Sequence, residues 1–182
     1  RKAFMELGDR IQEADSPEKW VDVYRQLVYW ELQLQEAESD MSEMLRMQKQ
    51  EANGSFAKFI RQNYDKWFSG SASNRPMLSP DLFREKVFPS LDKGEKVFLV
   101  IFDNLRYDQW RTLWSELSNL FSIEEELYFS ILPTVTQYAR NAICSGLMPS
   151  KIKELYPDLW VDEDEDEGKN LNEKQLIEAQ LY

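Results

Sequence analysis

The sequence predicts a helical bundle in residues 1–90, followed in residues 91–182 by part of an α/β domain with a parallel sheet. Apolar residues recur at helical spacing through the first part of the chain. Residues 97–102 then form an uninterrupted apolar run, which is typical of a strand buried in a parallel sheet. A helix, a second strand and another helix are predicted after it, an order that implies a right-handed crossover and parallel strands.

The first predicted helix covers residues 1–14, and a second begins at Ser16 and Pro17. Ser16 suits the N-cap position, and Pro17 suits the first helical position, where its missing N–H has no cost. One apolar stripe follows, formed by Trp20, Tyr24, Leu27, Trp30 and Leu34. The stripe either continues in one long helix or resumes in a new helix after Ser39 and Asp40, and the pattern leaves both arrangements open.

Asn53 and Gly54 predict a stop or a kink before a further helix. That helix carries an apolar face formed by Phe56, Phe59, Ile60, Tyr64 and Trp67. Aromatic faces of this kind favour the core of a small helical bundle over a dimerisation or docking surface. Both interpretations are compatible, since a bundle can bury one face and bind a partner with another. We therefore expect a bundle core, with a homodimer contact through the helical region as a further expectation.

The remaining elements are predicted from turn residues and apolar spacing. Gly70, Pro76 and several serines make residues 69–79 a loop or linker. Helices and a second strand are then expected, the helices at residues 81–88, 105–121, 137–145, 151–160 and 173–182 and the strand at residues 123–132. Gly146 is the expected end of the helix at residues 137–145.

Composition excludes several classes of protein. The formal net charge is −11, from 22 Lys and Arg against 33 Asp and Glu, which argues against a broad nucleic-acid-binding face because such faces are basic. No apolar stretch reaches the roughly 18 residues of a membrane span, and the opening residues do not resemble a secretory signal, so no membrane insertion is expected. Cys144 is the one cysteine, which excludes a disulfide framework within the chain and favours a cytoplasmic location.

The acidic residues 162–167 invite comparison with a calcium-binding loop. They lack the Gly and the alternating ligands of an EF-hand, so a solvated acidic loop is the better interpretation. The chain also opens and closes inside helical patterns, and two strands make too small a sheet to stand alone. We therefore expect a piece of a longer protein that supplies the other strands.

Two polar residues occupy positions where an α/β domain places its chemistry. Asp103 directly follows the apolar run at residues 97–102, and the sites of open sheets lie beyond the carboxyl ends of their strands. Thr136 precedes the helix predicted at residues 137–145, whose first N–H groups suit a phosphate or an alkoxide. A metal ligand and a hydroxyl nucleophile at these positions suit phosphoester cleavage. On residue chemistry alone, however, an N-cap is the simpler role for each.

Three short motifs resemble a known family. They are FDNLRYDQW at residues 102–110, PTVTQYARNA at residues 133–142 and SGLMP at residues 145–149. In this order they resemble the start of a PglZ domain of the alkaline phosphatase superfamily. The chain is similar to the PorX-type response regulators linked to type IX secretion, in which a receiver domain is followed by a helical bundle and a PglZ effector. The resemblance implies an alkaline phosphatase-like fold after the bundle.

The resemblance also implies a site. Asp103 corresponds to a metal ligand, and Thr136, more naturally than Thr134, corresponds to the nucleophile, which also binds the metal. The candidates to bind the substrate phosphate are Asn104, Arg106, Arg140 and Asn141. Zinc is the implied cofactor. The family's zinc sites also use His and further Asp residues, and this sequence has no His. Since zinc typically takes four ligands, the site in this chain is expected to be incomplete and the chain by itself a poor catalyst.

The function implied for the full-length protein is a zinc-dependent phosphodiesterase on nucleotide-type substrates, within a two-component system that regulates type IX secretion. Phosphorylation of the receiver would adjust dimerisation through the helical region. The alternative is a non-catalytic scaffold that binds a sensor kinase, a sigma factor or a secretion-system component. Arg106 and Arg140 also have a structural alternative, as ion-pair partners of Asp108 or of the acids at residues 124–126.

Overall fold

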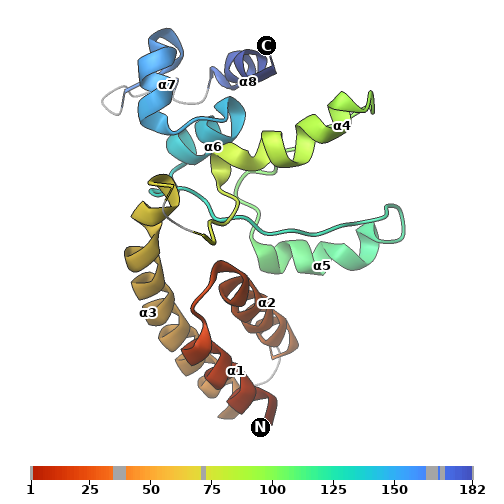
Figure 1. Cartoon of the computed structure of the whole chain (residues 1–182). Coiled ribbons are helices and arrows are strands. Elements are labelled where there is room, and N and C mark those ends of the chain that lie inside the picture. Colours follow the sequence, from red (N-terminus) through yellow and green to blue (C-terminus); the bar gives the residue numbers. More distant parts are fainter. Residues whose placement is uncertain (1, 35–39, 71–72, 163–167, 169–170, 182) are drawn as a thin grey trace. The chain divides into compact units, whose positions relative to one another are not determined.

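The structure is a computed structural model of the chain, and it describes all residues except 1, 35–39, 71–72, 163–167, 169–170 and 182. The chain divides into two compact units, each built from two separate stretches of sequence (Figure 1). The first unit combines Arg1–Pro76 with Ile101–Leu127, and the second combines Met77–Val100 with Tyr128–Tyr182. The chain passes from the second unit to the first within the apolar run that was expected to be a strand.

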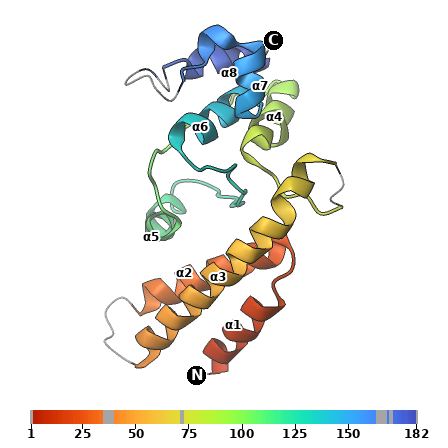
Figure 2. The same ribbon diagram turned by 90° about the vertical axis from the view of Figure 1, so that its left-hand side faces the viewer.

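The first unit contains helices α1 (Lys2–Glu13), α2 (Pro17–Gln33), α3 (Asp40–Phe68) and α5 (Tyr107–Leu117). Helices α1, α2 and α3 contact one another in a bundle (Figure 2), and α5 contacts α2. Ser16 caps α2 as predicted, because its Oγ accepts a hydrogen bond from the Lys19 N–H at 3.3 Å and Pro17 is the first helical residue. Of the two arrangements left open by the sequence, the structure has two separate helices, α2 and α3.

The stop or kink predicted at Asn53 and Gly54 is wrong, because α3 continues through both residues to Phe68. Glycine inside a helix costs only about 1 kcal/mol relative to alanine, and the neighbouring Lys, Gln, Glu and Ala residues are good helix formers. Leu45 before Gly54 and Phe59 after it are both buried. Packing of the helix against the bundle therefore outweighs the local preference of one glycine.

Aromatic side chains fill the core of the bundle. The ring centroids of Trp20 and Phe56 lie 5.2 Å apart, and the Phe59 ring lies 6.1 Å from both Trp20 and Trp67. Trp20, Phe59 and Trp67 are buried. The rings meet edge-on or tilted, as aromatic pairs prefer. The predicted bundle core is therefore confirmed for this face, while Met47 on α3 shows that other apolar side chains of the bundle face solvent.

The parallel sheet predicted for residues 91–182 is wrong. The described residues are mainly helical and contain no strand. The apolar run at residues 97–102 belongs to no regular element and is exposed, with 91% of the Phe98 surface open to solvent. A strand satisfies its N–H and C=O groups through a neighbouring strand, and the described part of the chain provides none for this run. Apolar character alone does not create that partner.

The second predicted strand is also wrong, and one isolated bridge marks its place. Leu78 pairs with Phe129 in a parallel bridge, where the Phe129 N–H donates to the Met77 carbonyl oxygen at 2.9 Å. The Ile131 N–H donates to the Ser79 hydroxyl oxygen at 3.1 Å. Leu78, Ser79 and Ile131 are buried. Phe129 and Ile131 are therefore held to the start of the second unit by single hydrogen bonds, without a sheet.

The second unit is a cluster of short helices. They are η1 (Ser79–Asp81), η2 (Phe83–Val87), α4 (Phe88–Asp92), α6 (Thr136–Ser145), α7 (Pro149–Leu155), η3 (Pro157–Leu159) and α8 (Glu173–Leu181). Helices η1 and η3 are 3-10 helices, and η2 is a π-helix. Helix α6 contacts η1, α7 and α8. Cys144, Ile152 and Leu176, one from each of α6, α7 and α8, form a buried core.

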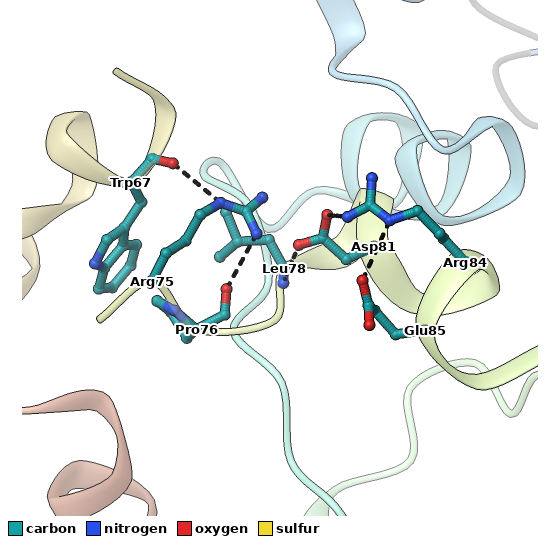
Figure 3. A network of polar contacts seen from close by, with 7 residues as sticks. All are labelled: Trp67, Arg75, Pro76, Leu78, Asp81, Arg84 and Glu85. Atoms are coloured by element: carbon teal, nitrogen blue, oxygen red, sulfur yellow. Dashed lines mark hydrogen bonds and ion pairs between the residues drawn. The ribbon is translucent and has the colours of Figure 1, made fainter. Parts of the chain in front are cut away.

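Polar contacts order the chain on either side of residue 77 (Figure 3). In the second unit, the buried Asp81 carboxylate accepts a hydrogen bond from the Leu78 N–H at 2.9 Å and pairs with Arg84 at 2.8 Å. In the first unit, the Arg75 Nε donates to the carbonyl oxygen of Trp67, in the last turn of α3, at 3.0 Å. Asp81 thus holds the first turn of η1, and Arg75 closes the C-terminus of α3.

Most of the predicted acidic loop, residues 163–167, lies outside the described residues, so its interpretation stays a prediction. Its first residue, Asp162, accepts from the Lys153 ammonium at 2.6 Å and from the Trp160 indole N–H at 3.0 Å. Asp162 is therefore bound to side chains of the second unit. None of the helices in the described part of the chain is both long and apolar enough to cross a membrane.

Candidate functional site

Thr136 is the first residue of α6, and Val135 occupies the N-cap position. The N–H groups of Tyr138 and Ala139 donate to the Val135 carbonyl oxygen at 3.0 and 2.9 Å, and no side-chain hydrogen bond caps the helix. The N-cap role considered for Thr136 is therefore wrong. Its half-buried side chain lies in the first helical turn, where helices carry N–H groups without helical partners and a partial positive charge.

Arg140 lies one turn after Thr136, and residues four apart are neighbours on a helix surface. Its Nη2 lies 2.6 Å from Oε1 of Glu173 on α8, and both side chains are about three-quarters buried. The partner is thus neither of those considered from the sequence. Because the guanidinium is already paired with a carboxylate, it offers a phosphate less positive charge than an unpaired arginine would.

Asn141 and Cys144 continue α6 toward the interior of the second unit, where both are buried. Burial and the negative charge of Glu173 raise the pKa of Cys144 to about 11, against an opposite effect of Arg140. The thiol is therefore protonated at neutral pH, and a protonated thiol is a poor nucleophile and metal ligand. Cys144 belongs to the core. For Asn141, the substrate-binding role stays a prediction.

A glutamine side chain with no signal in the sequence, Gln180, holds the C-terminal end of α6. The Gln180 amide donates to the carbonyl oxygens of Cys144 at 2.8 Å and Ile143 at 3.3 Å, at the C-terminal end of the helix. Gly146 ends the helix in the left-handed region with φ 69°, as predicted. A glutamine that reaches a carbonyl of a distant segment has no signature in local sequence, whereas a glycine after the last helical turn does.

Asp103 and Asn104 lie in the first unit, exposed in the turn that leads into α5. Asn104 has φ 58°, in the left-handed region, which asparagine tolerates better than most residues. Arg106 is the N-cap of α5, and its N–H donates to Oε1 of Gln109 at 3.0 Å, so the N-cap role considered for Asp103 is wrong. Arg106 also pairs with Asp108 at 2.8 Å, which confirms the structural alternative for this arginine.

The predicted site residues thus form two sets. Asp103 and Asn104 belong to the first unit, and Thr136, Arg140 and Asn141 belong to the second. Within the part of the chain that the structure describes, no three His, Cys, Asp or Glu side chains come together as a metal site. Because zinc typically takes four ligands, the described residues do not by themselves fit a zinc ion. The ligand roles of Asp103 and Thr136 stay predictions.

Comparison with known families supplies the class of the protein. Residues 82–182 match the BREX system PglZ alkaline phosphatase-like domain over more than half of the 182 residues, and the chain belongs to this family. Residues 1–68 match the PorX response regulator linker domain. The two matches in this order are those of a PorX-type regulator with a PglZ domain, which confirms the resemblance seen in the motifs. No curated protein matches the chain.

Proposed function

We propose that the protein is a cytoplasmic PorX-type response regulator whose PglZ domain cleaves nucleotide-type phosphodiesters and takes part in the control of type IX secretion. The observation that carries the proposal is the position of Thr136 at the start of α6. Since Val135 is the N-cap, the Thr136 hydroxyl is not needed to cap the helix. The alkaline phosphatase-like character of the matched family supports the reaction class.

In the proposed reaction, the Thr136 oxygen forms a bond to phosphorus while the bond from phosphorus to the leaving oxygen breaks. The hydroxyl proton is released, and the leaving alkoxide takes up a proton. Water then cleaves the threonine phosphoester, which frees a phosphomonoester and restores the hydroxyl. The N–H groups and partial positive charge at the start of α6 suit the negative charge that develops on the phosphoryl oxygens.

The remaining roles belong to the same proposal. Asn104, Arg140 and Asn141 are the proposed substrate-binding residues, and Asp103 and Thr136 the proposed zinc ligands. A zinc site needs ligands in addition to the described residues. Arg140 would have to share its guanidinium between the phosphate and Glu173, which it contacts at 2.6 Å.

Dimerisation through the helical region completes the proposal. Met5, Tyr29 and Met47 are exposed on helices of the bundle, which supports a surface available to a second copy. Phosphorylation of a receiver domain would adjust this contact. The scaffold function, with a sensor kinase, a sigma factor or a secretion-system component as partner, is the alternative outcome of the test below.

The test replaces Thr136 by alanine in the full-length protein, with zinc supplied. Loss of the nucleophile is expected to lower turnover of bis(p-nitrophenyl) phosphate on the order of 10³-fold or more. Thr134→Ala is the matched control, because Thr134 lies in the same motif but is exposed and precedes α6. Circular dichroism checks that both variants retain the helical fold.

Turnover by Thr136→Ala equal to that of the unmodified protein would remove Thr136 from the mechanism. An equal loss in Thr134→Ala would show that the motif, and not this hydroxyl, is required. If the unmodified protein with zinc has no turnover of any phosphodiester tried, the scaffold function is favoured.

A further inference from the structure

The Glu125 carboxylate in the first unit accepts hydrogen bonds from two side chains of helix α5. Glu125 follows α5 in the sequence, and its side chain is largely buried, at 15% exposure. The Tyr107 hydroxyl donates to Oε1 and the Trp110 indole N–H donates to Oε2, both at 2.8 Å. Tyr107 and Trp110 lie about one turn apart, so Glu125 is held along one face of the helix.

Helix α2 reaches the same carboxylate through Arg25. The Arg25 Nη2 lies 3.4 Å from Oε1 of Glu125 and donates to the Glu125 carbonyl oxygen at 3.4 Å. Arg111 of α5 adds a second cation, with Nη1 3.5 Å from Oε2. The rings of Tyr24 on α2 and Tyr107 on α5 lie beside these contacts, with centroids 5.5 Å apart. Glu125 is therefore a meeting point of α2 and α5.

Glu125 is ionised in this setting. Burial opposes the charge, but the hydrogen bonds from Tyr107 and Trp110 and the charges of Arg111 and Arg25 outweigh it, and the pKa of the carboxyl lies below its ordinary value. Removing one partner from a largely buried ion costs more than breaking an exposed pair. The buried Arg25 Nε has no partner among the described residues, so α2 holds the carboxylate less completely than α5 does.

The two sides of this contact belong to different family matches. Arg25 lies in the PorX linker match, residues 1–68, whereas Glu125 and α5 lie in the PglZ match, residues 82–182. Helix α5 begins directly after the turn of Asp103 and Asn104, and the contact of the Arg106 N–H with Gln109 ties the end of that turn to the first turn of the helix. A displacement of α5 therefore also displaces this turn.

We propose that Glu125 is the contact through which linker helix α2 sets the position of α5 and of the turn of Asp103 and Asn104. When α2 shifts, the Arg25 contact breaks first and α5 is released. When α2 is in place, Arg25 keeps the carboxylate and both helices together. The coupling rests on these contacts, and its consequence for a phosphate site rests on the proposed function.

Hydrogen–deuterium exchange of the full-length protein tests the coupling without turnover. Arg25→Gln removes the cation of α2 and is expected to speed exchange of the amides of Tyr107–Leu117 about fivefold, because opening of α5 loses one ionic partner. Arg46→Gln is the matched control. It breaks the exposed pair with Glu43 within α3 and should leave exchange of α5 unchanged.

Repeating the Arg25→Gln change in a protein that already carries Glu125→Gln shows whether the faster exchange of α5 depends on the Glu125 charge. In Glu125→Gln, the further change Arg25→Gln should alter exchange of α5 less than twofold, since the charge that Arg25 meets is gone. If Glu125→Gln does not fold, Arg25→Lys is measured instead, because it keeps the positive charge that faces Glu125 and should leave exchange of α5 within about twofold of the unmodified protein. A fivefold increase in Arg25→Lys would overturn the proposal as well. Unchanged exchange in Arg25→Gln, or the same fivefold effect in both backgrounds, overturns the proposal. Either result leaves the phosphodiesterase proposal untouched, since Thr136 is tested by turnover.

Discussion

The helical bundle of the first unit and the apolar run at residues 97–102 differ in where their backbone N–H and C=O groups can find hydrogen-bond partners. Helices α1, α2 and α3 make their hydrogen bonds within each helix, and Trp20 and Phe59 then pack into a buried core. The run at residues 97–102 consists entirely of apolar residues, yet Phe98 is almost wholly exposed. A strand makes its hydrogen bonds with a neighbouring strand, and the described residues offer this run none. A local sequence can complete a helix, but it cannot complete a sheet.

The largest expected effect is on stability and separates these two regions directly. Trp20→Ala is expected to cost about 3–5 kcal/mol of unfolding free energy, because the ring is buried against Phe56 and Phe59. Phe98→Ala should change that free energy by less than about 0.5 kcal/mol, since the side chain is exposed. Urea unfolding followed by circular dichroism measures both. Similar losses in the two variants would show that Phe98 is packed.

A pair of glycines gives a smaller contrast between helix interior and helix end. Gly146→Ala is expected to destabilise the second unit by about 1–2 kcal/mol, because φ is 69° and a Cβ would lie 2.5 Å from Oε1 of Gln180. Gly54→Ala is expected to stabilise the first unit by about 1 kcal/mol, since Gly54 lies inside α3 with open space around it. Thermal unfolding distinguishes these opposite signs. A stabilised Gly146→Ala would contradict the observed helix end.

The smallest expected effect is the acid dependence at Glu125. Its folded pKa lies below the ordinary value of 4.5, although burial opposes the charge, because Tyr107 and Trp110 donate to it and Arg111 and Arg25 face it. The carboxylate therefore contributes its full stability above pH 4.5 and loses it as the pH falls through the folded pKa. The stability difference between the unmodified protein and Glu125→Gln should shrink below pH 4.5.

The exposed carboxylate of Glu43 on α3 provides the control for this titration. It pairs with Arg46 at 2.6 Å, and this hydrogen bond lowers its pKa as well. Because salt screens exposed charges strongly and buried ones weakly, about 1 M salt should abolish the effect of Glu43→Gln and retain that of Glu125→Gln. Urea unfolding at two pH values and two salt concentrations measures both variants. Equal screening of the two would place Glu125 at the surface.

The helices were predictable because their determinants are local. Ser16 and Pro17 mark the start of α2, and Gly146 marks the end of α6, each through a backbone requirement of a single turn. The family motifs were likewise readable without a fold. Gly54 was misread because the packing of α3 involves the other helices of the bundle, which a local stop signal does not include.

The candidate site divides in the same way. The sequence identified Asp103 and Thr136 as residues at the ends of elements, and it offered an N-cap as the simpler role for each. Only the structure shows that Arg106 and Val135 hold those N-cap positions. The pairing of Arg140 with Glu173 could not be predicted, because an ion pair between α6 and α8 depends on the way two distant helices pack.

The amino-acid sequence by itself determined most of the helices, the start of α2, the end of α6, the family resemblance and the identity of the candidate residues, because hydrogen bonds within a turn and short motifs need no distant partner. The tertiary structure decided which apolar residues are buried and brought Arg25 of α2 to Glu125 beyond α5. It also gave the run at residues 97–102 no strand partner among the residues that the structure describes. Those outcomes depend on contacts between segments far apart in the chain. Periodicity and local propensity carry no information about such contacts.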